Sequence, residues 1–254
     1  MKITRAVVPS LFTVLNMFCG FMSIIHASSG EFIQASWLII LAAGFDALDG
    51  VMARITRSSS EFGIEIDSLS DVVSFGVAPA FLVYHVYLQE LGALGVLLSS
   101  LVMIFGGLRL ARFNVQLVGY DKEQFVGLPI PASAITLASF VLNYWSETSR
   151  LGNLASLLPW MVVGLSLLMV SKVKYDTLPR ISKRAVQKEP WKLIFSVLAI
   201  LVVFVTAGTA IFPLLVLFIS LGIIRYVGGS VKRLVHSQRK LVEEGSAQPT
   251  RIDI

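Results

Sequence analysis

Apolar runs of about twenty residues recur along almost the whole chain, and they restrict the folds that it can adopt. Of the 254 residues, 55% are hydrophobic and only 15% are charged. A soluble domain of this size carries about 25% charged residues. The sequence therefore predicts an all-α, polytopic membrane helical bundle rather than a soluble enzyme with a single anchor.

Eight membrane spans are predicted, and they group into a six-helix core followed by two further transmembrane helices. The predicted spans are residues 7–27, 32–53, 68–88, 91–111, 129–145, 153–171, 191–208 and 211–227. The first carries Pro9, Thr13 and Asn16, so we interpret it as a retained span and not as a cleaved signal peptide. The predicted organisation is a six-span core at 1–175, a basic cytoplasmic loop at 176–190, a two-span hairpin at 191–228 and a cytoplasmic tail at 229–254.

The distribution of basic residues predicts the orientation of these spans. If the N-terminus is cytoplasmic, every Lys and Arg except Arg150 falls in a segment on the inner side. Cytoplasmic loops carry an excess of Lys and Arg, so we expect a multi-pass protein of the cell membrane with both termini inside. The net charge of +5 follows from this topology, and we expect no nucleic-acid partner.

Four aspartates lie in or beside two neighbouring apolar segments. Asp46 and Asp49 are near the inner end of the second predicted span, and Asp67 and Asp71 are at the inner start of the third. Spacings of three and four residues place each pair on one face of a helix. An ionised carboxylate at membrane depth costs several kcal/mol unless it is paired, and these four also repel one another. Bound divalent cations would offset that cost.

Carboxylate oxygens suit hard cations, so we expect two ions of Mg²⁺ or Mn²⁺, with Ca²⁺ as a further possibility. Pairs of such ions are common where phosphoryl groups are transferred. Two alternatives stay open at this point. The aspartates could pair with arginines at the membrane edge (Arg54, Arg57, Arg109 and Arg112), or they could form the ion pathway of a transporter.

Further residues complete a spaced pattern around the aspartates, D-x2-D-G-x2-A-R-x8-G-x3-D-x3-D. It comprises Asp46, Asp49, Gly50, Ala53, Arg54, Gly63, Asp67 and Asp71. This pattern resembles the signature of the CDP-alcohol phosphotransferase family at every position. The segments PSLFTVLNMFCGFMSI, DVVSFGVAPA, GLRLARFNV and GLPIPASA resemble the integral-membrane phosphatidylserine synthases within that family.

The resemblance implies a six-helix membrane core, a dinuclear metal site and transfer of a phosphatidyl group from CDP-diacylglycerol to an alcohol, here L-serine. It implies that Asp46, Asp49, Asp67 and Asp71 hold the metals, with Asp71 also acting as the general base. The CDP site would comprise Asp49, Gly50, Ala53, Arg54 and Gly63, with Thr13 and Asn16 reaching the same cavity. An interhelical hydrogen bond is an equally good interpretation of Thr13 and Asn16.

The acceptor site is the least constrained part of the expectation. Arg112 with Asn114, and Arg109 one helical turn earlier, are the candidates for holding the serine carboxylate, because arginine binds carboxylates through two parallel hydrogen bonds. Positive-inside anchoring explains these arginines equally well. Glycerol 3-phosphate, inositol phosphate and choline stay open as acceptors. The expected partners are CDP-diacylglycerol, L-serine, membrane lipids and a second copy of the chain in a homodimer.

Overall fold

The computed structural model describes residues 7–56, 61–118, 127–146, 148, 151–173, 175, 202–203, 205–206 and 208–246. The predicted basic loop at 176–190 and most of the predicted seventh span at 191–208 lie outside these ranges. Within the described ranges the regular elements are helices, which confirms the all-α fold class.

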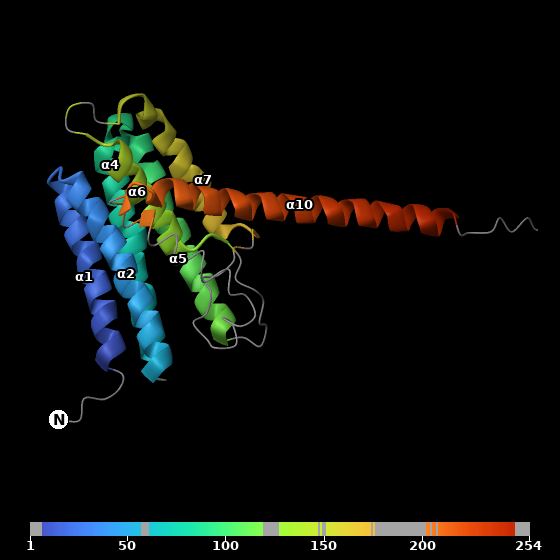
Figure 1. Ribbon diagram of the computed structural model, residues 1–254, viewed down its shortest axis with the longest axis horizontal. Helices are drawn as coiled ribbons and strands as arrows, with labels where there is room; N and C mark the ends of the chain where they lie inside the picture. The colour runs from blue at the N-terminus through green and yellow to red at the C-terminus, as the bar shows by residue number, and fades with distance from the viewer. Residues whose placement is uncertain are drawn as a thin grey trace, which may run out of the picture.

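The first two helices form an antiparallel hairpin. Helix α1 spans Val7–Ser28 and helix α2 spans Phe32–Thr56. Gly30 joins them with a φ of 82°, a backbone conformation that glycine adopts without steric cost. The two helices pack along each other, as Figure 1 shows, so residues near the start of α1 lie beside residues near the end of α2.

The third span is a single helical run that changes type once. Helix α3 covers Glu61–Asp71, a π-helical turn η1 covers Val72–Val77, and helix α4 covers Ala78–Val86. The run begins before the predicted start at residue 68, because the amphipathic segment from Glu61 continues the helix beyond the apolar stretch. Asp71 is the last residue before the π-helical turn, and such turns occur frequently at functional sites.

The remaining helices of the core are α5, α6 and α7. A short 3₁₀ turn η2, Leu88–Leu91, leads into α5, Ala93–Val118, which extends beyond the predicted end at residue 111. Helix α6 spans Ile130–Tyr144 and has a proline in its first turn, where its missing N–H leaves no intrahelical bond unmade. A second 3₁₀ turn η3, Gly152–Leu157, precedes α7, Leu158–Val170.

The last helix, α10, spans Ile211–Ser246 and is continuous across the predicted boundary between hairpin and tail at 228–229. It contacts α6 at its start and then extends away from the other helices (Figure 1). Tyr175 and Phe218 pack against each other near the start of α10, with ring centroids 5.5 Å apart.

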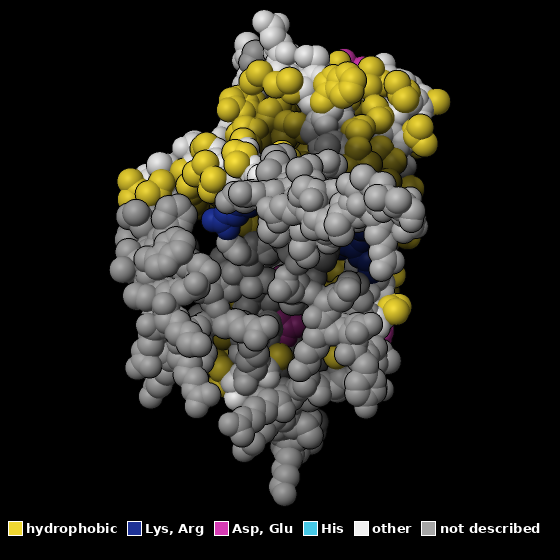
Figure 2. Space-filling model, turned by 90° about the vertical axis from the view of Figure 1, so that its right-hand side faces the viewer, with side chains coloured by type: hydrophobic (Ala, Val, Ile, Leu, Met, Phe, Trp, Pro, Cys, Tyr) yellow, Lys and Arg dark blue, Asp and Glu magenta, His cyan; other side chains and the backbone are white. Residues whose placement is uncertain are grey.

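Six of the described helical runs are long and apolar enough to cross a membrane by length and composition. These are Leu11–Ser28, Phe32–Ala53, Phe62–Val86, Ala93–Val115, Gly152–Val170 and Ile211–Gly229. The predicted fifth span corresponds to α6, a shorter apolar helix of 15 residues. Hydrophobic side chains cover the upper part of the face seen in Figure 2, and Lys or Arg side chains lie below them.

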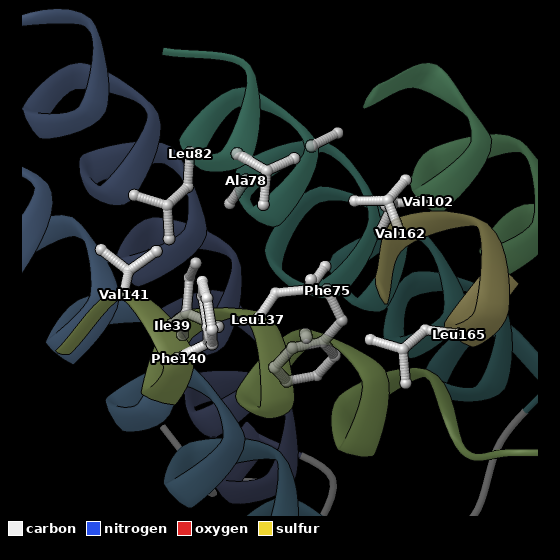
Figure 3. Packing of buried hydrophobic residues seen from close by; sticks show 14 of the residues in the cluster. Ile39, Phe75, Ala78, Leu82, Val102, Leu137, Phe140, Val141, Val162 and Leu165 are labelled. Atoms are coloured by element: carbon white, nitrogen blue, oxygen red, sulfur yellow. The ribbon is translucent and has the colours of Figure 1, made fainter. Parts of the chain in front are cut away.

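The hydrophobic core lies where the third span meets α5, α6 and α7. Phe75 of η1 is fully buried among Leu137 of α6 and Leu165 of α7 (Figure 3). Val102 of α5 and Val162 of α7 extend the same cluster. The π-helical turn that follows Asp71 is therefore packed on the core side, which holds the adjoining aspartate helix in a fixed place.

Candidate active site

Three of the four aspartates come together. Asp46 lies near the end of α2, and Asp67 and Asp71 lie in the second half of α3. One carboxylate oxygen from each of the three lies within 4.8 Å of the others. This spacing allows the three carboxylates to bind one metal ion together, and a cluster of carboxylate oxygens is the donor set that hard divalent cations prefer.

Asp49 lies beside this cluster and is held differently. Its Oδ2 accepts a hydrogen bond from the Thr13 hydroxyl at 2.5 Å. Its Oδ1 is buried and has no hydrogen-bond partner among the described residues. A buried carboxylate oxygen without a partner is costly, so a cation at Oδ1 would remove an energetic penalty. The four aspartates therefore fit a metal site.

Helix α1 provides the contacts around the aspartates on one side. The Asn16 amide donates a hydrogen bond from Nδ2 to Asp71 Oδ1 at 3.3 Å. The Ser70 hydroxyl donates to the Thr13 carbonyl oxygen at 3.0 Å, and the Ser74 hydroxyl donates to the Asn16 carbonyl oxygen at 2.8 Å. Thr13 and Asn16 thus form interhelical hydrogen bonds, which was one of their two interpretations, whereas their place in the CDP site stays a prediction.

The nearest described cation is Arg109 of α5. Coulomb attraction couples Arg109 to Asp71, although no ion pair between them is formed in the described part of the chain. The Nε atom of Arg109 is buried and unpartnered among the described residues. An ion pair between His26 and Glu31 lies at the opposite end of α1. Arg109 is thus near Asp71 without an ion pair to it, and the side chains of Arg54 and Arg57, the other arginines closest in sequence to the aspartates, lie outside the described part of the structure.

The residues predicted for the CDP site lie on the same two helices. Among the described residues, no atom lies within 4 Å of a Cβ atom added to Gly50 of α2, so these residues leave space beside it. Ala53 is half-buried on α2, and Gly63 is half-buried on α3. The side chain of Arg54 lies outside the described part of the structure. The assignment of these residues to a nucleotide stays a prediction.

The residues predicted for the acceptor site have different surroundings. Arg112 donates from Nη1 to the Val170 carbonyl oxygen at 3.3 Å, at the end of α7. Asn114 donates from Nδ2 to the Ser68 hydroxyl at 3.0 Å, which brings it beside the helix of Asp67. Ser68 was not among the predicted site residues, because its pairing with Asn114 depends on how α3 and α5 cross.

A family model described as CDP-alcohol phosphatidyltransferase matches residues 6–171, which include α1, all four aspartates and α7. The chain belongs to the CDP-alcohol phosphatidyltransferase family. This match confirms the resemblance of the eight-residue pattern to that family. Members of this family use divalent metal ions, and the Asp46, Asp67 and Asp71 group could hold one.

Relatives of this phosphatidyltransferase occur in bacteria and archaea. It is 37% identical over 234 residues to the CDP-diacylglycerol–serine O-phosphatidyltransferase of Helicobacter pylori strain J99, covering 91% of this chain and 95% of that protein. It is 40% identical over 178 residues to the archaetidylserine synthase of Methanothermobacter thermautotrophicus, covering 68% and 72%. The CDP-diacylglycerol–serine O-phosphatidyltransferase of Bacillus subtilis is 34% identical over 181 residues, covering 71% and 94%.

Proposed function

We propose that this phosphatidyltransferase moves a phosphatidyl group from CDP-diacylglycerol to L-serine and releases CMP. The observation that carries the proposal is the convergence of Asp46, Asp67 and Asp71 within a chain that matches the CDP-diacylglycerol–serine O-phosphatidyltransferase of Helicobacter pylori over nearly its full length. The carboxylate cluster supports the phosphoryl chemistry, and the relatives' names support serine as the acceptor.

In the proposed reaction the serine hydroxyl oxygen attacks the phosphorus that carries the diacylglycerol. A new phosphorus–oxygen bond forms, the bond from that phosphorus to the bridging oxygen breaks, and CMP leaves with the bonding electrons. The hydroxyl proton passes to a carboxylate, because an alcohol is a poor nucleophile until a base accepts its proton. We assign that role to Asp71, which lies one turn further into the span than Asp67.

We propose two divalent cations, Mg²⁺ or Mn²⁺ with Ca²⁺ as a further possibility, held by Asp46, Asp49, Asp67 and Asp71. When bound, such ions supply positive charge that stabilises the phosphate oxygens during displacement. The protein's part is to hold the carboxylates in place. Asp49 fits this assignment because Thr13 occupies Oδ2 and leaves Oδ1 open.

Gly50, Ala53, Arg54, Gly63 and the carboxylate of Asp49 are proposed to line the CDP site. The space beside Gly50 supports this assignment, because a residue without a side chain lets the diphosphate group of CDP approach the backbone closely. The lipid tails of the donor would leave sideways into the bilayer.

For the acceptor we propose Arg109, Arg112 and Asn114. Arg109 has the strongest structural support, because it lies near Asp71 and its Nε is unpartnered among the described residues. A guanidinium in that position can bind the carboxylate of serine beside the base that takes the hydroxyl proton. Asn114 lies close by through its bond to Ser68.

The charge asymmetry of the sequence supports a site that opens to the cytoplasm of the cell, where serine and CMP are dissolved. We propose this orientation, the cell membrane as the location, and the homodimer that the family resemblance implies. Labelling of single introduced cysteines from either side of sealed vesicles tests the orientation, and the mass of the protein–detergent complex tests the homodimer.

The purified protein tests the proposed reaction with CDP-diacylglycerol, Mn²⁺ or Mg²⁺, and a panel of acceptors comprising serine, glycerol 3-phosphate, inositol phosphate and choline. CMP release that requires serine supports the proposal, whereas release with another acceptor alone contradicts it. A parallel reaction with the CDP-linked archaeal diether lipid compares donors, because one relative is an archaetidylserine synthase.

A further inference from the structure

Two buried polar side chains in the first half of helix α1, Thr13 and Asn16, both donate hydrogen bonds to the aspartates. Thr13 and Asn16 are 3% and 0% exposed. The Thr13 hydroxyl donates to Asp49 of α2, and the Asn16 amide donates to Asp71 of α3. One helix thus contacts an aspartate from each of the two helices that build the site.

Two serines of the third span hold the backbone of Thr13 and Asn16. Ser70 and Ser74, both fully buried, donate their hydroxyl hydrogens to the carbonyl oxygens of Thr13 and Asn16. A fifth residue of this contact is Gly20, where an added Cβ atom would lie 2.6 Å from the Ser74 Cα atom. Helix α1 therefore lies close against the third span, and neither Thr13 nor Asn16 can shift without breaking a buried hydrogen bond.

The hydrogen bond from Thr13 makes the two carboxylate oxygens of Asp49 different from each other. Because Oδ2 accepts the hydroxyl hydrogen, Oδ1 is the oxygen that stays without a described partner. A carboxylate that could rotate freely would present either oxygen, whereas this one is held with a particular oxygen open. Side chains that orient metal ligands in this way typically raise metal affinity by about 10–100-fold.

We infer that Thr13 and Asn16 are positioning residues that orient the carboxylates of Asp49 and Asp71 for cation binding. They act through the aspartates and do not need to touch the nucleotide, which departs from their predicted place in the CDP site. The inference rests on the proposed metal site, because an orientation of carboxylates has a measurable consequence only when a cation binds them.

The variants are chosen so that side-chain volume changes little. Thr13→Val replaces the hydroxyl with a methyl group, Thr13→Ser keeps the hydroxyl, and Asn16→Leu removes the amide. Ser36→Ala is the matched control, because Ser36 is also a buried hydroxyl but donates to the Phe32 carbonyl of its own helix. Asp67→Asn removes a carboxylate from the cluster itself.

The readout is the rise in melting temperature that Mn²⁺ produces in the purified protein without substrate, followed as a function of Mn²⁺ concentration. Thr13→Val and Asn16→Leu should each need about 10–100-fold more Mn²⁺ for half of the rise. Thr13→Ser and Ser36→Ala should follow the wild-type curve. At saturating Mn²⁺, the KM for CDP-diacylglycerol of Thr13→Val should equal that of the wild type.

Two results separate the possible failures. A Thr13→Val protein with the wild-type Mn²⁺ curve and a raised KM for CDP-diacylglycerol would overturn the inference and return Thr13 to the nucleotide site. A wild-type protein whose melting temperature does not respond to Mn²⁺, or an Asp67→Asn protein with an unchanged response, would instead overturn the metal site. If Thr13→Val does not fold, Asn16→Leu decides the inference by the same measurement.

Discussion

Asp46 in the second half of α2 and Asp71 at the end of α3 each place a carboxylate oxygen within 4.8 Å of the other. No described cation forms an ion pair with either side chain. Two carboxylates this close repel each other strongly in a membrane segment. The divalent cations that we propose would offset this repulsion, which connects the packing of the two helices to the proposed chemistry.

The Asp71→Asn substitution should abolish most of the activity while preserving the fold. The amide has nearly the same shape but cannot accept the serine proton, and a general base typically contributes about 10²–10⁴-fold. We expect kcat for CMP release to fall by that factor. Glu31→Gln serves as the control, because Glu31 is an exposed carboxylate at the opposite end of the α1–α2 hairpin. Full activity of Asp71→Asn would remove Asp71 from the reaction.

Gly50→Ala should impair donor binding without destabilising the protein. An added methyl group meets no atom of the described residues within 4 Å, so their packing accepts it, but it would occupy the space proposed for CDP. We expect the KM for CDP-diacylglycerol to rise about 10–100-fold, as when a bound group is displaced by about 1 Å. Gly44→Ala on the same helix has equally open surroundings and should keep the wild-type KM. Equal kinetics for the two variants would argue against a nucleotide beside Gly50.

Arg109→Lys and Arg112→Lys should have different effects. Arg109 lies by Asp71 with an unpartnered Nε, so its replacement should raise the KM for serine about tenfold or more, the loss expected for one hydrogen bond between charged groups. Arg112 donates to the Val170 carbonyl at the end of α7, so its replacement should lower the melting temperature. A raised serine KM in Arg112→Lys alone would contradict this ranking and make Arg112 the principal acceptor residue.

Gly127→Ala should destabilise the junction between α6 and α7. Gly127 has a φ of 95°, its N–H donates to the Val173 carbonyl at 2.8 Å, and an added Cβ atom would overlap the Met169 carbonyl. The positive φ alone costs about 1–2 kcal/mol for alanine, which lowers the melting temperature by roughly 2–8 °C. Gly164→Ala in α7 meets no atom within 4 Å and should lower it by less. Equal melting temperatures would contradict this account of the junction.

Much of the site could be predicted from the sequence because it depends on local spacing. Asp46 and Asp49 share a face of α2, Asp67 and Asp71 share a face of α3, and a short loop makes the two helices neighbours. The sequence spacing could not predict that Asp49 is held by a hydrogen bond from Thr13, whereas the other three aspartates form the cluster. This hydrogen bond depends on where α1 crosses α2, which brings the Thr13 hydroxyl to one oxygen of Asp49.

The two arginines of α5 show the same limit. Arg109 and Arg112 lie three residues apart on one helix, and the spacing alone does not tell which of them faces Asp71. The rotation of α5 about its axis decides this, and that rotation is set by the packing of Val102 against α7 and of Gly106 against Ile130. The start of the third span at Glu61 was also missed, because hydropathy marks the apolar part of a helix and not its polar extension.

The oxygen atom that joins serine to the lipid tests the central claim most directly. Purified protein is incubated with CDP-diacylglycerol, Mn²⁺ and L-serine that carries ¹⁸O in its hydroxyl group, and both products are analysed by mass spectrometry. The account predicts phosphatidylserine that retains the ¹⁸O and CMP that contains none. Phosphatidic acid together with a labelled CMP–serine ester, or phosphatidylserine without ¹⁸O, would contradict attack by the serine hydroxyl on the lipid-bearing phosphorus.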